Sequence, residues 1–300
     1  MRRDLLLVAW AGIAIAQSAC SPRAARDPSS GNGDNATIRV MTFNVRYADT
    51  IPPNAWSTRR ALVRDVIARA SPDLIGTQEG LYQQVKDVAG DFPDYDWIGL
   101  GREGGSRGEF MAVFYRASRF EPLDYDHYWL SATPGEIGSR SWGNTIPRMV
   151  TWVRFRDVAS GRELVLINTH LDHQSQPARD SSAALIARRS RRWDEQVPVI
   201  LTGDFNAAAG DNTVYALLTG EAGFADTWML AGGADTLGTY HAYRGLAAAR
   251  GVRRIDWILV RGPVTTLSTA ILTDEWSGRY PSDHFPVVAT LRLEPAGVGR

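Results

Sequence analysis

Short runs of apolar and β-branched residues recur along most of the chain, and their length and composition predict β-strands. These runs are Ile38–Val45, Leu74–Thr77, Met111–Tyr115, Met149–Phe155, Leu164–Asn168, Val199–Thr202, Ile255–Val260 and Phe285–Leu293. Apolar residues at helical spacing are rarer and predict three helices, over residues 62–70, 177–193 and 213–218. Many strands with few helices between them indicate an α/β fold: a four-layer α/β/β/α sandwich of two packed mixed sheets flanked by helices.

The first residues have the pattern of an export signal. Met1-Arg2-Arg3 is basic, and the apolar run Leu5–Ala16 is shorter than the roughly 20 residues that span a bilayer. Together they predict a signal peptide over residues 1–20. Cys20 follows Ser18-Ala19 and resembles a bacterial lipoprotein cleavage site, although Gln17 stands where an aliphatic residue is usual. We expect an exported protein, located in the periplasm or cell envelope, that a lipid on Cys20 anchors to a membrane. Ordinary signal cleavage is the alternative.

The composition of the remaining residues predicts a tether, one domain and a tail. Residues 21–36 are rich in Pro, Ser, Gly and Asn without apolar periodicity, which predicts a flexible tether. One domain is expected over residues 37–294, followed by a tail over 295–300. Apart from Cys20 the chain has no thiol for a disulfide or a cysteine–zinc site. The 33 basic and 33 acidic residues balance, so the composition gives little support to a partner that is a long polyanion.

Polar residues lie at the end of almost every predicted strand. They are Asn44, Glu79, Asn168, His170, Asp204, Asn206, Asp256, Asp283 and His284. Each one alone reads equally well as a turn residue, but strand ends are where sheet-based enzymes bring remote side chains together. Oxygen donors fit Mg²⁺ or Mn²⁺, and histidines beside carboxylates fit proton transfer. The set predicts metal-assisted hydrolysis of a phosphate ester. A serine esterase fits this residue set less well, and zincins are disfavoured because His-Glu-x-x-His does not occur.

The polar residues belong to six short motifs that occur in a fixed order. These are Thr42-Phe43-Asn44-Val45-Arg46, Gln78-Glu79, Asn168-Thr169-His170, Gly203-Asp204-Phe205-Asn206, Arg254-Ile255-Asp256-Trp257 and Ser282-Asp283-His284-Phe285-Pro286. As an ordered set over Thr37–Leu293, they resemble the endonuclease/exonuclease/phosphatase superfamily. The resemblance is greatest to a bacterial exported subgroup of undefined substrate. The superfamily includes deoxyribonucleases, apurinic endonucleases, sphingomyelinases and inositol-polyphosphate phosphatases.

The resemblance implies a metal site. Glu79 would ligate the essential Mg²⁺ or Mn²⁺, Asn44 would help to bind metal or phosphate, and Asp283 would lie at the metal or its water. Arg46 stands where some members place a second metal-ligating carboxylate. One bound ion is therefore expected.

The resemblance also implies catalytic roles. Asp204 and Asn206 would orient or deprotonate the attacking water and contact the phosphate. His284, paired with Asp256, would transfer a proton or stabilise developing charge. His170 matches a histidine of the deoxyribonuclease-like and sphingomyelinase-like branches. Because His284 and Asp256 must meet, we expect the strands that carry them to be neighbours in one sheet.

Substrate contacts are assigned to Arg148, His173 and His241, with Glu109 as a further pocket candidate. Trp142 and Trp276 are stacking platforms or, by default for tryptophan, core residues. A small sugar- or nucleotide-linked phosphodiester is the favoured substrate. Nucleic acid, or a phospholipid such as sphingomyelin, are alternatives. An inositol polyphosphate is disfavoured because Lys86 is the only lysine. A non-catalytic binding module is a remote alternative.

Overall fold

The computed structural model describes residues 35–234 and 236–295, which form two six-stranded mixed sheets. The first sheet has the order β13 (Val264–Ile271), β14 (Val287–Leu293), β1 (Thr37–Asn44), β2 (Leu74–Gln78), β6 (Val113–Arg116) and β4 (Tyr95–Ile98). The second has β11 (Ala225–Asp226), β12 (Asp256–Arg261), β10 (Val199–Asp204), β9 (Arg162–His170), β8 (Met149–Asp157) and β7 (Phe120–Trp129). A small third sheet pairs β3 (Gly80–Leu81) with β5 (Glu109–Phe110).

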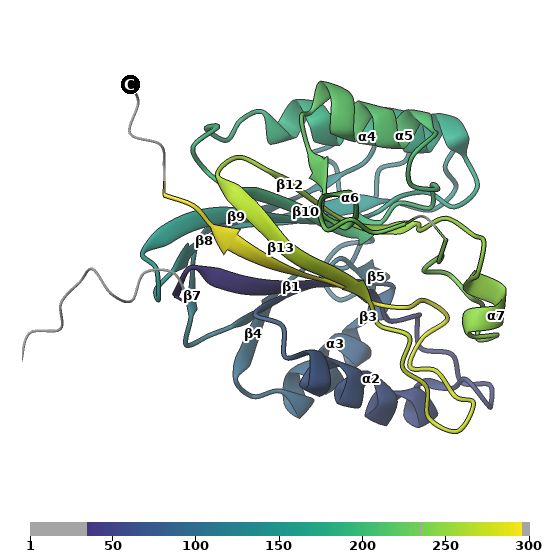
Figure 1. Ribbon diagram of the computed structural model, residues 1–300. Helices are drawn as coiled ribbons and strands as arrows, with labels where there is room; N and C mark the ends of the chain where they lie inside the picture. Colours follow the sequence, from purple (N-terminus) through teal and green to yellow (C-terminus); the bar gives the residue numbers. More distant parts are fainter. Residues whose placement is uncertain (1–34, 235, 296–300) are drawn as a thin grey trace, which may run out of the picture.

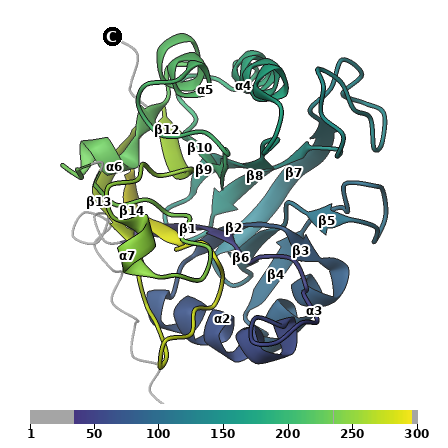
Figure 2. The same ribbon diagram turned by 90° about the vertical axis from the view of Figure 1, so that its right-hand side faces the viewer.

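Helices cover the outer faces of the two large sheets (Figure 1). Helices α2 (Trp56–Ala70) and α3 (Tyr82–Asp91) lie against the first sheet. Helix α4 (Gln176–Ser190), α5 (Thr213–Ala216) and the π-helical turn η1 (Leu217–Glu221) lie against the second. The short helices α6 (Thr227–Leu230) and α7 (Leu246–Ala249) lie in connecting segments. Seen from the side in Figure 2, the elements form four layers, so the predicted sandwich is confirmed.

The central strands are buried on both faces, and alternation along each strand decides which layer a side chain enters. In β1, Ile38 and Val40 enter the core between the sheets, whereas Met41 and Phe43 pack beneath α2 and α3. This double burial explains why the strands read as continuous apolar runs rather than as alternating ones.

All eight predicted strands and all three predicted helices are present, although α2 begins six residues before its predicted start, and helix α3 was not predicted. The two long strands that the pattern missed, β7 and β13, are edge strands. Much of β7 is exposed, and it carries charged residues such as Glu121 and Asp124, which is how edge strands avoid unwanted pairing. Edge strands therefore lack the apolar run that marks the central ones.

One topological prediction is wrong. The strand that begins at Asp256 and the strand that follows His284 are not neighbours in one sheet, because β12 belongs to the second sheet and β14 to the first. They face each other across the inter-sheet core, where Ile258 and Val260 of β12 pack in the same cluster as Val287 and Ala289 of β14.

Several sequence-based expectations concern residues outside the described part of the chain. The signal peptide with Cys20 lies wholly outside it, as do nearly all of the tether and the tail. Within residues 35–234 and 236–295, no helix is long and apolar enough to span a membrane.

Candidate active site

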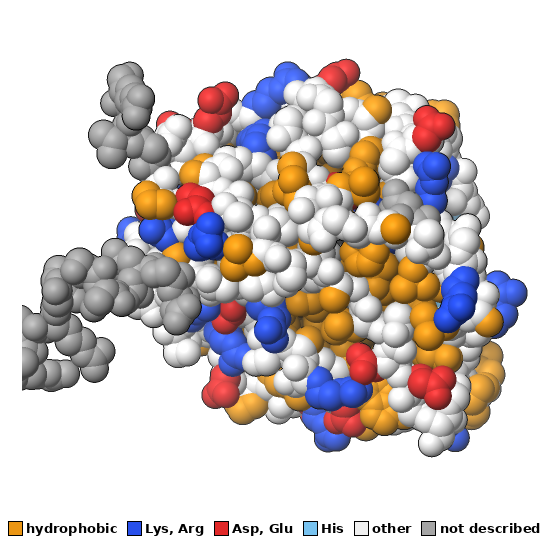
Figure 3. Space-filling model, in the orientation of Figure 1, with side chains coloured by type: hydrophobic (Ala, Val, Ile, Leu, Met, Phe, Trp, Pro, Cys, Tyr) orange, Lys and Arg blue, Asp and Glu red, His pale blue; other side chains and the backbone are white. Residues whose placement is uncertain are grey.

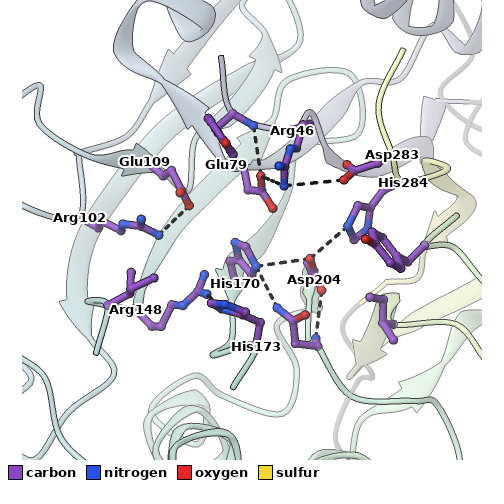
Figure 4. A pocket seen from close by; sticks show the side chains of 15 residues that line it. Arg46, Glu79, Arg102, Glu109, Arg148, His170, His173, Asp204, Asp283 and His284 are labelled. Carbon is purple, nitrogen blue, oxygen red and sulfur yellow. Dashed lines mark hydrogen bonds and ion pairs between the residues drawn. The ribbon is translucent and has the colours of Figure 1, made fainter. Parts of the chain in front are cut away.

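Strand ends and loops from both large sheets meet around a pocket of about 330 Å³ (Figure 4). One end of the pocket is lined by Glu79, Asp204, Asp283, His284 and Arg46. The opposite end is lined by Arg102, Glu109, Arg148 and His173, and His170 lies between the two ends. We call these the acidic end and the arginine end.

Asn44, at the last position of β1, holds the acidic end together. Its Nδ2 donates to Glu79 Oε1 and to Asp204 Oδ2, both at 2.9 Å. Its Oδ1 accepts a hydrogen bond from the Arg46 N–H at 2.9 Å. This contact fixes the orientation of the amide, because exchanging O and N would place the NH₂ group against a backbone donor. Asn44 was predicted to help bind metal or phosphate. In this orientation its amide holds two carboxylates, those of Glu79 and Asp204.

His284 and Asp256 meet across the two sheets. His284 Nδ1 lies 2.9 Å from Asp256 Oδ2, and its Nε2 lies 3.8 Å from Asp204 Oδ2. Thr239 Oγ1 accepts from the Asp256 N–H, and Ser282 Oγ accepts from the His284 N–H. Burial disfavours the imidazolium, but the charges of Asp256 and Asp204 outweigh it and raise the pKa of His284.

Asp204, Asn206 and His170 form the floor of the pocket. The Asn206 N–H donates to Asp204 Oδ1 at 3.0 Å, and Asn206 Nδ2 lies 3.0 Å from His170 Nε2. Burial, followed by the negative charge of Asp256, raises the pKa of Asp204. Burial and the charge of Arg148 lower the pKa of His170 well below its usual value, so its imidazole is neutral at pH 7. The floor therefore combines a carboxylate of raised basicity with a neutral imidazole.

The residues present fit a divalent metal ion. Ligand atoms of Glu79, Asp204 and His284 all lie within 4.8 Å of one another. Burial works against ionisation of Glu79, but His284 and the Asn44 amide lower the pKa of its carboxyl below the usual value. An ionised carboxylate is the form that a metal ligand needs. Asp283 also lines this end, with Oδ2 at 3.7 Å from Arg46 Nη1.

The arginine end contains a buried guanidinium with unused donors. Arg148 is 4% exposed and lies just before β8. Its Nη2 lies 2.9 Å from His173 Nδ1, and its Nε lies 3.6 Å from Asp172 Oδ2. Among the described residues, its Nη1 has no hydrogen-bond partner. Arg148 lines the pocket, where a guanidinium can bind an anion, but its Nη1 atom is itself buried and so marks no separate binding place.

Two functional arginines were missed from the sequence. Arg102 lines the arginine end and donates to Glu109 Oε2 at 2.6 Å. Arg59 of α2 is 1% exposed and lies beneath the pocket, where it donates to the backbone carbonyls of Val45, Arg46 and Pro281. A signal for Arg59 was available: it occupies the same helical face as Val63, Val66 and Ile67, which is the buried one. No sequence signal distinguishes Arg102 from a surface arginine.

Three predicted or considered residues lie outside the pocket. His241 was expected to contact substrate, but its imidazole stacks on Phe285 at a centroid distance of 3.9 Å, and its Nδ1 accepts from the Gly245 N–H. Burial lowers the pKa of His241 to about 4, which suits this packing role. Trp142 and Trp276 pack against core clusters.

Three site residues have left-handed backbone conformations. The φ angles of Arg46, Glu79 and Asn206 are 56°, 62° and 47°. Such angles are uncommon for residues other than glycine, and they cluster at functional sites in proteins. Here they direct all three side chains into the pocket from the tight turns that follow β1, β2 and β10.

The comparison with known families matches this architecture. Residues 41–284 match the model described as "Endonuclease/Exonuclease/phosphatase family". The chain belongs to this family. The matched span contains every residue of the acidic end, and the resemblance inferred from the motifs is confirmed. The family consists of hydrolases that act on phosphoester bonds and use divalent metal ions, in agreement with the acidic triad.

Solved structures of family members are similar over most of the chain. An endonuclease/exonuclease/phosphatase from Bacteroides vulgatus is 34% identical, with 86% of this chain and 99% of that one covered and a TM-score of 0.80. A mannosyl-6-phosphatase from Bacteroides thetaiotaomicron is 29% identical, with 85% of this chain and 99% of that one covered and a TM-score of 0.78.

Carbon catabolite repressor protein 4 homolog 3 of Arabidopsis thaliana is a relative by sequence and is 23% identical over 184 residues. That match spans 59% of this chain but only 38% of the plant protein.

Proposed function

We propose that this protein is an exported, divalent-metal-dependent phosphoesterase that hydrolyses small phosphodiesters by attack of an activated water. The observation that carries the proposal is the Asn44 amide, which joins Glu79 and Asp204 beside the His284–Asp256 pair at one end of a pocket. With this arrangement Glu79 would act as a metal ligand, Asp204 as a base and His284 as a charged imidazole on one phosphate group.

The residues divide the reaction between them. Glu79 would hold the ion, and Lewis-acid polarisation of a phosphoryl oxygen is the chemistry that a divalent ion supplies there. Asp204, whose pKa is raised, accepts a proton from the attacking water. The imidazolium of His284, held by Asp256, stabilises negative charge as it develops on the phosphoryl oxygens. Asn206 and His170 face the same space and orient the water and the phosphate.

The charged side chains that line the pocket are close to balance. Its lining contains the carboxylates of Glu79, Glu109, Asp204 and Asp283 against the guanidiniums of Arg46, Arg102 and Arg148. A phosphomonoester is close to a dianion at pH 7, whereas a phosphodiester carries a single charge. With the His284 imidazolium and a bound divalent ion the net charge of the site is positive, so it attracts either ester, and the substrate panel described below decides between them.

A second cavity supports a substrate larger than a phosphate group. It measures about 340 Å³ and shares Arg102 and Ile146 with the pocket. Arg140, Glu103 and Thr145 give it a polar lining, suited to hydroxyl groups. A sugar as one alcohol of the ester fits this lining, and the similar Bacteroides thetaiotaomicron mannosyl-6-phosphatase supports a sugar-linked substrate.

The alternative substrates have less support. The face shown in Figure 3 carries acidic and basic side chains interspersed, rather than a basic stripe that would follow a nucleic-acid backbone. A phospholipase would need exposed apolar groups to enter a membrane. Between Asp256 and Asp283, among the described residues, Leu267 is the one large apolar side chain that is exposed.

A substrate panel tests the proposal. The purified domain is assayed with chromogenic phosphodiesters and phosphomonoesters and with sugar phosphates, in Mn²⁺, in Mg²⁺ and after chelation. We expect turnover that requires the metal and a higher kcat/KM for the diesters. Full activity without metal would contradict the mechanism. A preference for sugar phosphate monoesters would show that the substrate is a monoester and not a diester. No turnover of any ester would favour a binding module.

A further inference from the structure

The guanidinium of Arg46 lies between two carboxylates of the acidic end. Its Nη1 is 3.7 Å from Glu79 Oε2 and 3.7 Å from Asp283 Oδ2 (Figure 4). The two carboxylate side chains are only 12% and 7% exposed. Two largely buried carboxylates without a cation between them would be strongly destabilising. Arg46 therefore acts as their counter-ion in the metal-free protein.

Glu79 belongs both to the Glu79–Asp204–His284 cluster that would hold a divalent ion and to the ion pairs of Arg46. Glu79 would hold the ion through its charged carboxylate, so the ion would compete with the guanidinium for that charge. The Arg46 side chain is 32% exposed and lines the pocket, so it can turn toward the substrate.

The backbone of Arg46 is fixed, which confines such a movement to the side chain. Its N–H is bound by Asn44 Oδ1, and its carbonyl accepts from Gln84 Nε2 at 2.9 Å and from Arg59 Nη2 at 3.1 Å. The guanidinium also lies over the ring of Tyr47, another pocket residue, at 4.3 Å from its centroid. An arginine whose backbone is fixed and whose side chain is flexible can exchange one anionic partner for another.

We propose that Arg46 is a cation that exchanges with the metal. Without metal it holds Glu79 and Asp283; when the metal binds, it is released into the pocket and binds the substrate's phosphate. The inference rests on the proposed function for the identity of the substrate. It predicts that loss of the guanidinium strengthens metal binding and weakens phosphate binding, two shifts of opposite sign.

Calorimetric titration of the domain with Mn²⁺ alone tests the first half. In Arg46→Met, which keeps the length but removes the charge, we expect a dissociation constant about tenfold lower than in the wild type, or about 1.4 kcal/mol. Arg102→Met is the matched control, because it removes a pocket guanidinium that pairs with Glu109 rather than with Glu79. It should leave the Mn²⁺ constant within about twofold. In a protein that already carries Asp283→Asn, adding Arg46→Met should increase the affinity for Mn²⁺ by less than it does in the wild type, since one ion pair of Arg46 is already gone.

Titration of the Mn²⁺-loaded protein with inorganic phosphate tests the second half. We expect Arg46→Met to bind phosphate at least about tenfold more weakly, since it lacks the charge-assisted hydrogen bonds of the guanidinium. Unchanged or weaker Mn²⁺ binding overturns the exchange, and so does unchanged phosphate affinity. If Arg46→Met does not fold, Arg46→Lys keeps a charge without the bridging fork and should show the same two shifts at smaller size. Metal binding with these shifts but without turnover would contradict only the proposed function.

Discussion

Asn44 shows how one side chain organises a site through its hydrogen bonds alone. Its amide nitrogen lies 2.9 Å from a Glu79 oxygen and 2.9 Å from an Asp204 oxygen, and 3.5 Å from His284 Nε2. Glu79 follows a strand of the first sheet, and Asp204 ends a strand of the second. A single amide therefore sets the spacing between the Glu79 and Asp204 carboxylates.

The His284–Asp256 pair carries the sharpest prediction at the residue scale. We expect His284→Ala to lower kcat by about 10² to 10³ and Asp256→Asn to lower it comparably, because removing one group that stabilises developing charge typically costs that much. The losses should be strongly non-additive, since the two groups act as one unit. Steady-state kinetics of both single variants and the double variant measure this, with thermal melting as the folding control. Additive losses would show that the residues act independently.

Glu79 should affect the metal more than the chemistry. In Glu79→Gln the amide cannot supply a charged oxygen, so we expect the Mg²⁺ or Mn²⁺ concentration for half-maximal activity to rise at least about tenfold. Excess metal should restore part of the activity. A metal dependence identical to that of the wild type would remove Glu79 from the metal site.

At the scale of elements, the two sheets make a polar contact close to the site. Asn168 of β9 donates to the carbonyls of Thr77 and Ala112, and its Oδ1 accepts from Gln78 Nε2 at 2.7 Å. This contact is possible because Gly76 of β2 has no side chain: a Cβ there would lie 2.3 Å from Thr202 Oγ1 and 2.6 Å from Asn168 Oδ1. The sheets thus approach closely at Gly76, near the strand ends that line the pocket.

Gly76→Ala should therefore destabilise the protein. The added methyl group must push apart two sheets that are held by hydrogen bonds, and such overpacking costs roughly 1–3 kcal/mol. Urea unfolding measures the loss. Gly90→Ala in α3 is the control, because a Cβ there meets nothing within 4 Å and alanine is the better helix former. Equal stability of the two variants would contradict this account of the sheet contact.

At the scale of the molecule, the chain pairs a compact hydrolase domain with an N-terminal segment whose pattern predicts export. We propose that a lipid on Cys20 anchors the domain to a membrane. The full-length protein produced in a bacterium should then partition with membranes, and Cys20→Ser should release it or block its processing. Fractionation and mass spectrometry of the N-terminus measure this outcome. An unmodified N-terminus generated by ordinary signal cleavage would show secretion without an anchor.

The sequence by itself determined the fold class, the central strands and the set of residues that line the acidic end. It could do so because burial on both faces produces apolar runs, and because functional residues such as Glu79, Asp204 and His284 interrupt those runs at their ends. Local patterning contains this information without reference to the rest of the chain.

Only the tertiary structure decided which strands are neighbours and which donors meet. The expectation that β12 and β14 share a sheet was wrong, since two strands whose ends meet can lie side by side or face to face, and the apolar pattern is the same in both cases. Likewise, Arg46, Arg59 and Arg102 have the same side chain, yet one bridges two carboxylates, one is buried beneath the pocket and one pairs with Glu109. Their roles depend on partners that are remote in sequence, and only the packing of the two sheets brings those partners into contact.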